Sequence, residues 1–246
     1  MMLDEDVELL EGLPIAHIKS INSIVVADMH LGYEGAMAGE GAFLPKVNLK
    51  EICREVKEGI ARSGAERVIV DGDIKSEFSK VSVDELNELH GFASFLEKEG
   101  VMPVLVKGNH DNFVDRYRGA FRMEIYGGHA EIGEYLFLHG DKEPASIKRR
   151  TRMVVMGHEH PAITISTALG RREKVKCFLY GRYRGKGLLV LPAIGYFSTG
   201  MDVGAAGHGM LSPILRRGGI GSMHAIACAY GSTIDFGKVS DLRGKI

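Results

Sequence analysis

Five short polar motifs occur along this chain, each at the end of a short apolar run. In order they are Asp28-Met29-His30, Gly72-Asp73, Gly108-Asn109-His110-Asp111, His139-Gly140 and Gly157-His158-Glu159-His160. Their carboxylates, amide and imidazoles are side chains that bind divalent cations, and there are enough of them for two ions. Two metal ions held side by side are typical of phosphate-ester chemistry. Because a carboxylate can bridge two cations, we expect Asp73 to lie between the ions.

His110 directly follows Asn109, and the side chains of adjacent residues usually diverge. We therefore expect Asn109 to face an ion with its neutral carbonyl oxygen and His110 to face the substrate. There the imidazole can protonate a leaving alkoxide or stabilise charge on the phosphoryl oxygens, and such proton transfer contributes about 10²–10⁴-fold in rate. We expect Asp111 to hold this imidazole in its charged form.

The first half of the chain alternates short apolar runs with helical patterns. The spacing predicts strands at 23–27, 67–70 and 101–106, a helix at 47–62, and a second helix from the capping box Ser82–Glu85 to Gly100. This alternation favours a parallel sheet with right-handed crossovers. In such sheets the working residues collect at the carboxyl ends of the strands, which is where the first three motifs fall.

The second half consists of short apolar runs separated by Gly-rich turns. Strands are predicted at 130–138, 153–156, 163–167, 175–180 and 187–191, mostly antiparallel, with 223–229 as a last edge strand. We expect one domain over residues 1–246, because motifs from both halves are needed for one site. The Gly-rich tail, from about 200 to 246, is expected to pack on or extend the core, either capping the sheet or forming a dimer surface.

The formal net charge of −1 over 246 residues produces no global attraction to nucleic acid or to a membrane. The charge is uneven, however, since residues 148–186 hold eleven Lys or Arg residues against two Glu residues. From this segment we expect substrate contacts by Arg149, Arg150, Arg182 and Arg184. The alternative is that these basic residues are simply solvated.

Three scattered cysteines do not form a disulfide framework. No apolar stretch approaches the ~18 residues of a membrane-spanning helix. The amino terminus is acidic and lacks the basic region of a signal peptide. These features favour a cytoplasmic protein without a membrane partner.

The five motifs together resemble the calcineurin-like metallophosphoesterases, whose blocks read D-x-H, G-D, G-N-H-[DE], a lone H, and G-H-x-H. The resemblance extends from Asp28 to His160. It implies an α/β fold, a sandwich of two mixed β-sheets flanked by helices in four layers. It also implies two divalent metal ions, with a hydroxide that bridges them as the nucleophile and His110 as proton donor or transition-state stabiliser.

The resemblance also implies which residues bind each ion. One ion is assigned to Asp28, His30, Asp73 and His160, and the other to Asp73, Asn109, His139 and His158. Imidazole suits Mn, Fe, Zn and Ni alike, whereas carboxylates favour Mn or Fe. A mixed set of nitrogen and oxygen ligands therefore does not choose the metal. Our expectation is Mn²⁺, with Fe, Zn or Ni as alternatives.

Two shorter stretches, 72–75 and 211–215, are similar to the archaeal SbcD-related phosphoesterases and to the bacterial DNA-ligase-associated phosphoesterases. Ser76 stands where the SbcD-type nucleases carry a histidine, which weakens the expectation of exonuclease activity. Glu159 stands where threonine is common in the family, and we expect its side chain to point away from the ions.

The sequence therefore predicts an enzyme, a two-metal phosphoesterase that hydrolyses phosphodiester bonds. The expected substrates are nucleic acids, DNA or RNA, or nucleotides. The alternatives are a small-molecule phosphomonoesterase, a cyclic-nucleotide phosphodiesterase and a non-catalytic scaffold. The scaffold is disfavoured because every expected ligand position is filled.

Overall fold

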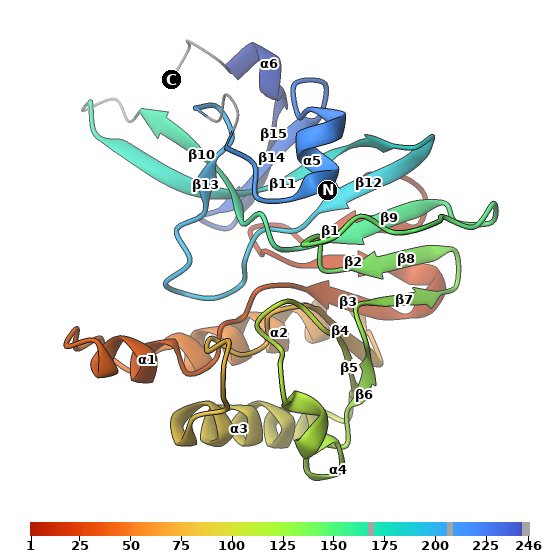
Figure 1. Ribbon diagram of the computed structural model, residues 1–246. Coiled ribbons are helices and arrows are strands. Elements are labelled where there is room, and N and C mark those ends of the chain that lie inside the picture. Colours follow the sequence, from red (N-terminus) through yellow and green to blue (C-terminus); the bar gives the residue numbers. More distant parts are fainter. Residues whose placement is uncertain (167–169, 206–208, 243–246) are drawn as a thin grey trace.

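Two β-sheets face each other, and helices cover their outer sides (Figure 1). The computed structural model describes residues 1–166, 170–205 and 209–242. The first sheet has the strand order β1 (Val7–Leu9), β2 (Ala16–Ile18), β3 (Ser23–Val26), β4 (Arg67–Asp71), β5 (Met102–Val106) and β6 (Glu124–Tyr126). Strands β3 to β6 run parallel, and β1 and β2 add an antiparallel edge next to β3. The parallel order of the three predicted strands is thus confirmed.

The two predicted helices form the crossovers between these strands. They are α2 (Asn48–Ser63) and α3 (Val83–Glu99), and each ends at a glycine in the left-handed conformation. The capping box is present: the Ser82 hydroxyl accepts the Glu85 N–H at 3.1 Å, and the Glu85 carboxylate accepts the Ser82 N–H at 2.7 Å. The other helical segments in this half are η1 (Lys19–Ile21), α1 (Tyr33–Gly39), η2 (Val114–Tyr117) and α4 (Arg118–Phe121).

The second sheet is mixed, and its central strands are parallel. Its main path is β13 (Met201–Asp202), β10 (Pro161–Ser166), β11 (Arg172–Tyr183), β12 (Lys186–Val190), β9 (Met153–Met156), β8 (Tyr135–Leu138) and β7 (His129–Ile132). Strands β8, β9 and β12 run parallel, whereas most other pairs are antiparallel. The run predicted as one strand at 130–138 is the hairpin β7–β8, which turns at Gly133 with a φ of 59°.

The Gly-rich tail extends the second sheet. It contains α5 (Pro213–Gly218), β14 (His224–Ala229), β15 (Ser232–Lys238) and α6 (Val239–Leu242). Strand β14 was expected at the edge, but it lies between β11 and β15, so β15 is the edge strand. Thr167, at the end of one predicted strand, and tail residues 206–208 and 243–246 lie outside the described residues.

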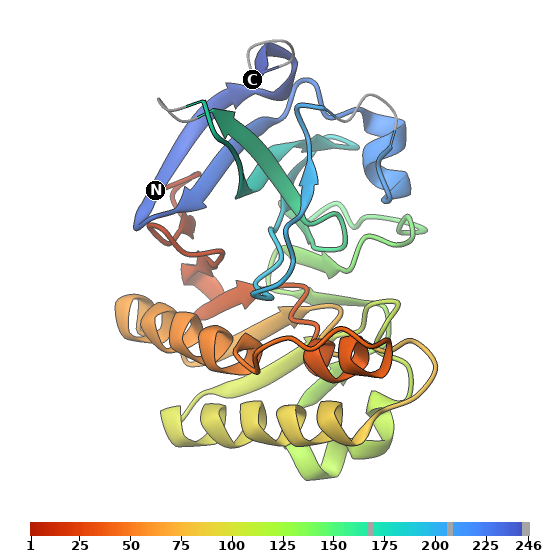
Figure 2. The same ribbon diagram turned by 90° about the vertical axis from the view of Figure 1, so that its left-hand side faces the viewer.

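Three apolar layers hold the architecture together. One lies between the sheets, where Val25, Ile69 and Val104 of the first sheet share a cluster with Phe137 and Phe178 of the second. The next joins the first sheet to α2 and α3, and the third joins the second sheet to α5 and α6. The turned view shows α2 and α3 on the face of the first sheet that is toward the viewer (Figure 2). Within the described part of the chain, no helix combines the length and apolar character needed to cross a membrane.

Candidate metal centre

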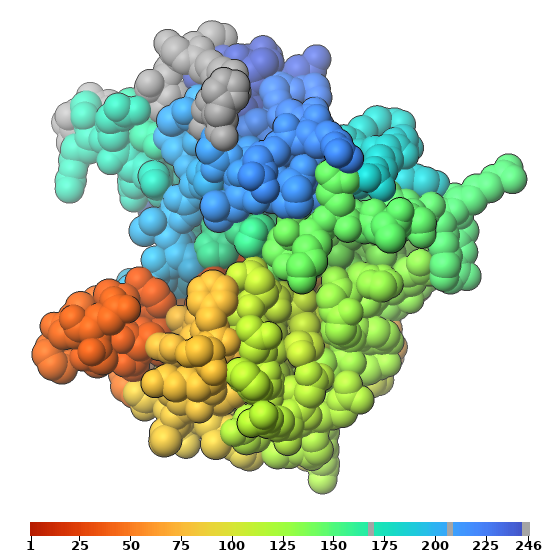
Figure 3. All heavy atoms as spheres, in the orientation of Figure 1, coloured from red at the N-terminus to blue at the C-terminus, as the bar shows by residue number. Residues whose placement is uncertain are grey.

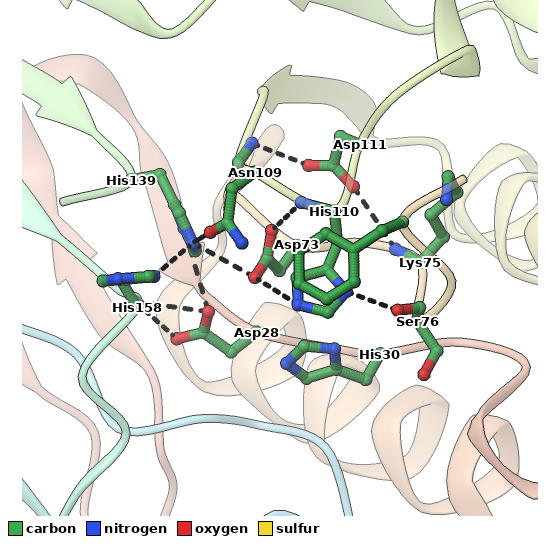
Figure 4. Close-up of polar contacts among 12 residues, drawn as sticks. Asp28, His30, Asp73, Lys75, Ser76, Asn109, His110, Asp111, His139 and His158 are labelled. Carbon is green, nitrogen blue, oxygen red and sulfur yellow. Dashed lines mark hydrogen bonds and ion pairs between the residues drawn. The ribbon is translucent and has the colours of Figure 1, made fainter. Parts of the chain in front are cut away.

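All five polar motifs meet at one end of the two sheets. Asp28 follows β3, Asp73 follows β4 and Asn109 follows β5 in the first sheet, while His139 follows β8 and His158 follows β9 in the second. Since these strands run parallel within each sheet, their carboxyl ends lie side by side and the following side chains converge (Figure 4). We call Asp28, His30, Asp73, Asn109, His139, His158 and His160 the ligand cluster.

The ligand cluster contains two adjacent groups of ligating atoms. Asp28, His30 and His160 form one, with all three ligating atoms within 4.8 Å of one another. The Nε2 atom of His160 lies 3.3 Å from Asp28 Oδ1 and 3.4 Å from His30 Nε2. Asp28 is fully buried, while both imidazoles are partly exposed, so the group opens toward solvent on its histidine side.

The second group consists of Asp73, His139 and His158, again within 4.8 Å. His139 Nε2 lies 3.1 Å from Asp73 Oδ2, 3.1 Å from His158 Nδ1 and 3.0 Å from Asn109 Oδ1. His30, His110 and Asp73 also lie within 4.8 Å, so Asp73 stands next to both groups. This is where a carboxylate shared between two ions has to be.

The charges within the cluster show that a cation fits. In each group two imidazole nitrogens face each other, and such a pair needs a proton or a metal ion between its lone pairs. Burial acts to lower the pKa of His139, but Asp73 and Asp28 raise it to about 10, whereas burial and the charge of His139 lower the pKa of His158. Each pair contains one imidazole that attracts a proton and one that resists it. A divalent cation would take the place of that proton in this donor set.

The other pair behaves in the same way. Burial acts against protonation of His160, yet the nearby Asp28 raises its pKa, while burial lowers the pKa of His30 to about 4. Burial would raise the pKa of Asp28, but His160 and His139 lower it. The pKa of Asp73 is lowered as well, because the hydrogen bond and charge of His139 outweigh burial. Both carboxylates are thus kept ionised, as metal ligands must be.

Backbone strain is concentrated at these residues. Among the described part of the chain, ten non-glycine residues have a positive φ, and five of them are Asp28, His30, Asp73, His158 and His160. A left-handed conformation costs a non-glycine residue about 1 kcal/mol or more, and such strain gathers at functional sites. Two glycines let the motifs approach closely: a Cβ on Gly72 would lie 2.0 Å from His139 Nδ1, and one on Gly108 would lie 2.2 Å from Asp73 Oδ1.

His110 lies beside the ligand cluster, but its orienting partner differs from the expected one. Its Nε2 is 3.8 Å from Asp73 Oδ2, and its Nδ1 forms a short hydrogen bond with the carbonyl oxygen of Ser76 (Figure 4). The Asp111 carboxylate instead accepts the N–H groups of Gly108 at 2.8 Å and Lys75 at 3.4 Å. Burial and the charge of Asp73 raise the pKa of Asp111 to about 6. Asp111 therefore joins two ligand-bearing turns, and the expectation that it holds the imidazole is corrected.

The supporting roles of two side chains could not be read from the sequence, because their partners are backbone groups. The first is Asn48, which is buried at the start of α2. Its amide donates to the carbonyls of Met29 and His30, both at 3.1 Å, and its oxygen accepts the Tyr196 N–H at 2.8 Å. Asn48 thus fixes the turn that carries the first motif.

The second is Glu159, whose side chain points away from the ligand cluster. Its carboxylate accepts the N–H groups of Leu211 at 3.0 Å and Ser212 at 2.9 Å. The Ser212 hydroxyl in turn donates to the Gly140 carbonyl at 2.7 Å. The start of α5 therefore ties the loop of His158 and His160 to the loop of His139.

Asp71 is a buried carboxyl group beside the ligand cluster. It is the last residue of β4 and is fully buried, and neither carboxylate oxygen has a hydrogen-bond partner among the residues that the structure describes. Burial raises its pKa well above the ordinary value. Burial thus disfavours the ionised form of this carboxyl group next to the ligand cluster.

The four predicted basic contacts lie elsewhere. Arg149 and Arg150 precede β9, and Arg182 and Arg184 lie at the β11–β12 turn, which is the opposite end of the second sheet from His139 and His158. Arg150 pairs with Glu131 at 3.5 Å, and Arg184 pairs with Glu143 at 2.7 Å. The structure does not bring these side chains to the ligand cluster, so their contact with a substrate stays a prediction.

A large cavity opens beside Asn109. Its volume is about 910 Å³, and its walls include Asn112, the glycines 127–128 and the loop at 140–146 that follows His139. In the space-filling view the two halves of the chain meet along a hollowed seam on the front face (Figure 3). The ligand cluster thus adjoins a space larger than an inorganic phosphate needs.

Comparison with known proteins identifies the fold. No protein-family model matches the chain, and no curated protein matches its sequence. Among solved structures, the Pseudomonas putida nuclease MPE is similar with a TM-score of 0.66 and 15% identity, over 93% of this chain and 94% of that one. The chain has the fold of this nuclease. The expected fold class, two mixed sheets flanked by helices, is therefore confirmed.

A second solved structure, YfcE, described as a phosphoesterase from E. coli, is less similar. Its TM-score is 0.44 at 16% identity, over 86% of this chain and 96% of that one. The narrower resemblance to the archaeal SbcD-related branch stays a prediction.

Proposed function

We propose that this protein is a metal-dependent phosphoesterase that hydrolyses phosphodiester bonds of nucleic acids or nucleotides. The observation that carries the proposal is the pair of adjacent ligand groups, each with facing imidazoles and an ionised carboxylate. Asp73 belongs to one group and lies next to His30 of the other. Its fold is that of a protein named a nuclease. Asp28, His30, Asp73 and His160 would hold one divalent ion, and Asp73, Asn109, His139 and His158 the other.

The residues divide the work of the reaction between them. When bound, the two ions would neutralise phosphoryl charge and make hydroxide available near neutral pH. Asp28 and Asp73, kept ionised by their histidine neighbours, supply the negative charge that retains the ions. His110, fixed by the Ser76 carbonyl, directs Nε2 toward Asp73, where it can donate a proton to the leaving oxygen.

A diester is favoured over a monoester because of the space next to the cluster. The cavity of about 910 Å³ beside Asn109 accommodates substituents on both sides of a phosphate. Binding of a nucleic acid through several backbone phosphates makes its affinity for the protein fall steeply with salt. The salt dependence of binding would therefore separate nucleic acids from small diesters.

The decisive experiment is turnover by metal-free protein reconstituted separately with Mn²⁺, Fe²⁺, Zn²⁺, Ni²⁺ or Mg²⁺. The substrates are bis-p-nitrophenyl phosphate, p-nitrophenyl phosphate, cyclic nucleotides, and single- and double-stranded DNA and RNA. We expect metal-dependent hydrolysis of the diesters, strongest with Mn²⁺. Exclusive hydrolysis of the monoester would overturn the diester assignment, and no hydrolysis with any metal would overturn the enzymatic one.

A further inference from the structure

One aromatic ring at the rim of the ligand cluster has no role in holding a metal ion. Phe78 lies against His110, with ring centroids 3.5 Å apart and an interplanar angle of 34°. Phe78 nevertheless remains 53% exposed. Since one face lies on the imidazole, the opposite face and the edge are what solvent reaches.

The loop that carries Phe78 is held in place by buried charges. The fully buried Lys75 ammonium donates to the carbonyls of Glu77 and Lys80. The equally buried Glu85 carboxylate accepts the N–H groups of Glu77 at 2.6 Å and Ser82 at 2.7 Å. Two buried polar side chains, one at each end of this short loop, are a strong constraint, because leaving either without its hydrogen bonds is costly.

Further contacts fix the ring relative to the chemistry. The Ser76 carbonyl binds His110 Nδ1, and the amide of Asn112 donates to the Phe78 carbonyl at 3.2 Å. Asn112 also lines the large cavity beside Asn109. Phe78 thus lies against the predicted proton donor, and the side chain that binds its carbonyl also lines the cavity.

The position of Phe78 relates it to one side of the scissile bond. His110 Nε2 points toward Asp73, so a leaving oxygen that takes its proton lies in front of the imidazole. Because Phe78 lies on the face of the same imidazole, its exposed face is within reach of the group attached to that oxygen. A planar aromatic group stacks well on such a ring, and nucleobases do so regardless of their sequence.

We propose that Phe78 is a stacking platform for the nucleobase on the leaving-group side of the scissile phosphate. The inference rests on the proposed function. It adds that the protein binds the base of the nucleoside on the leaving-group side of the scissile bond. The alternative is that Phe78 only shields and positions His110. The two differ in one respect: a platform matters only when a base is present.

Dinucleotides test this, because each has a single phosphodiester bond. The substrates are thymidylyl-(3′→5′)-thymidine and its two analogues in which one or the other nucleoside is an abasic tetrahydrofuran residue. Product analysis identifies which nucleoside leaves as the alcohol. For the wild type with Mn²⁺, we expect kcat/KM to fall roughly 5- to 100-fold on the analogue that lacks the leaving-side base, and little on the other.

The variants complete the test. Phe78→Leu keeps an apolar cover on His110 but removes the planar face. It should therefore lower kcat/KM for the full dinucleotide to the wild-type value for the analogue that lacks the leaving-side base. Phe78→Tyr should retain the wild-type preference. Phe236→Leu makes the same substitution at another exposed phenylalanine, on edge strand β15, and should change nothing.

The outcomes separate the two proposals. If Phe78→Leu lowers kcat/KM equally on all three dinucleotides, Phe78 is a positioning residue for His110 and the platform is overturned. If Phe78→Leu lowers kcat/KM on none of them, the platform is overturned as well. Failure of the wild type to hydrolyse any of the three would instead overturn the proposed action on nucleotide diesters.

Discussion

At each end of strands β8 and β9 a cluster of polar side chains surrounds a buried carboxylate, but only one cluster is complete in itself. At the amino ends Asp4, Asp6, Ser20, Tyr135 and Arg152 form what we call the Asp6 network. Asp6 accepts the Ser20 N–H at 2.7 Å, the Ser20 hydroxyl at 2.6 Å and the Tyr135 hydroxyl. Arg152 pairs with Asp4 at 2.8 Å and lies 3.9 Å from Asp6. Each carboxylate has donors and a cation from the protein itself.

The ligand cluster at the carboxyl ends has a different balance. Its carboxylates face imidazoles, and its imidazoles face one another at 3.1 and 3.4 Å. A proton or a metal ion between the two nitrogens closes each of these contacts. The comparison shows that burial of polar groups does not by itself mark a functional site. What distinguishes the ligand cluster is that its imidazole nitrogens face one another and the carboxylates, which together are a donor set for a divalent cation.

Of the variants that test this comparison, Asp73→Asn should have the largest effect on metal binding and turnover. Asp73→Asn removes the carboxylate that stands next to both ligand groups, so we expect metal occupancy to fall at both and turnover to fall to background. Metal analysis of the purified variant and its turnover of bis-p-nitrophenyl phosphate check this. Full occupancy in Asp73→Asn would contradict a shared ligand.

His110 separates chemistry from metal binding within the same region. His110→Ala removes the predicted proton donor but none of the assigned ligands, so turnover should fall about 10²–10⁴-fold with metal content unchanged. Parallel metal analysis and steady-state kinetics measure both quantities. Turnover at the wild-type rate would refute the assigned role.

Glu159 tests how the ligand cluster depends on the tail. Glu159→Gln keeps the size of the side chain but replaces one acceptor oxygen with an amide N–H donor. The glutamine can no longer accept one N–H on each of two oxygens, so the contact with either Leu211 or Ser212 is lost. Loss of such supporting contacts typically weakens metal affinity about 10–100-fold. Mn²⁺ titration by calorimetry checks this, and unchanged affinity would show that the tail does not position His158 and His160.

The Asp6 network should affect stability alone. Tyr135→Phe removes a hydrogen bond to an ionised carboxylate, and we expect the free energy of unfolding to fall by about 1.5–3 kcal/mol. Metal content and turnover should stay at wild-type values, because the change lies at the opposite end of β8. Urea unfolding, metal analysis and kinetics measure the three quantities, and a loss of bound metal would end the distinction between the two regions.

The smallest expected effect is the pH dependence of the stability that Tyr135→Phe loses. Burial would raise the pKa of Asp6, but its hydrogen bonds to Ser20 and Tyr135 and the charge of Arg152 lower it. A carboxyl group with a lowered pKa stabilises the fold above its unfolded pKa of about 3.9, and this stabilisation is lost as the pH falls through the folded value. The stability difference between wild type and Tyr135→Phe should therefore be constant near neutral pH and shrink in acid. A difference independent of pH would mean that Tyr135 does not act through the ionised Asp6.

Much of the ligand cluster and its scaffold follows from local patterns. We predicted β3, β4 and β5 from apolar runs of strand length, and α3 from the capping box at Ser82. The positions of the motifs at the strand ends predicted that these ends converge. The prediction was less accurate in the second half. There β7 and β8 were merged, because a turn as short as that at Gly133 barely interrupts an apolar run. The edge strand β15 was missed, since three of its seven residues are charged or glycine and few of them are buried.

The sequence alone determined the donor types, their order and their places at strand ends, because these depend on residue identity and on the period of local structure. Only the tertiary structure decided the partners of His110, Glu159 and Asn48. Those partners are backbone N–H and C=O groups, which every residue carries and which no motif can single out. The same holds for Phe78, whose position over His110 results from a loop fixed by Lys75 and Glu85 and not from its spacing in the chain.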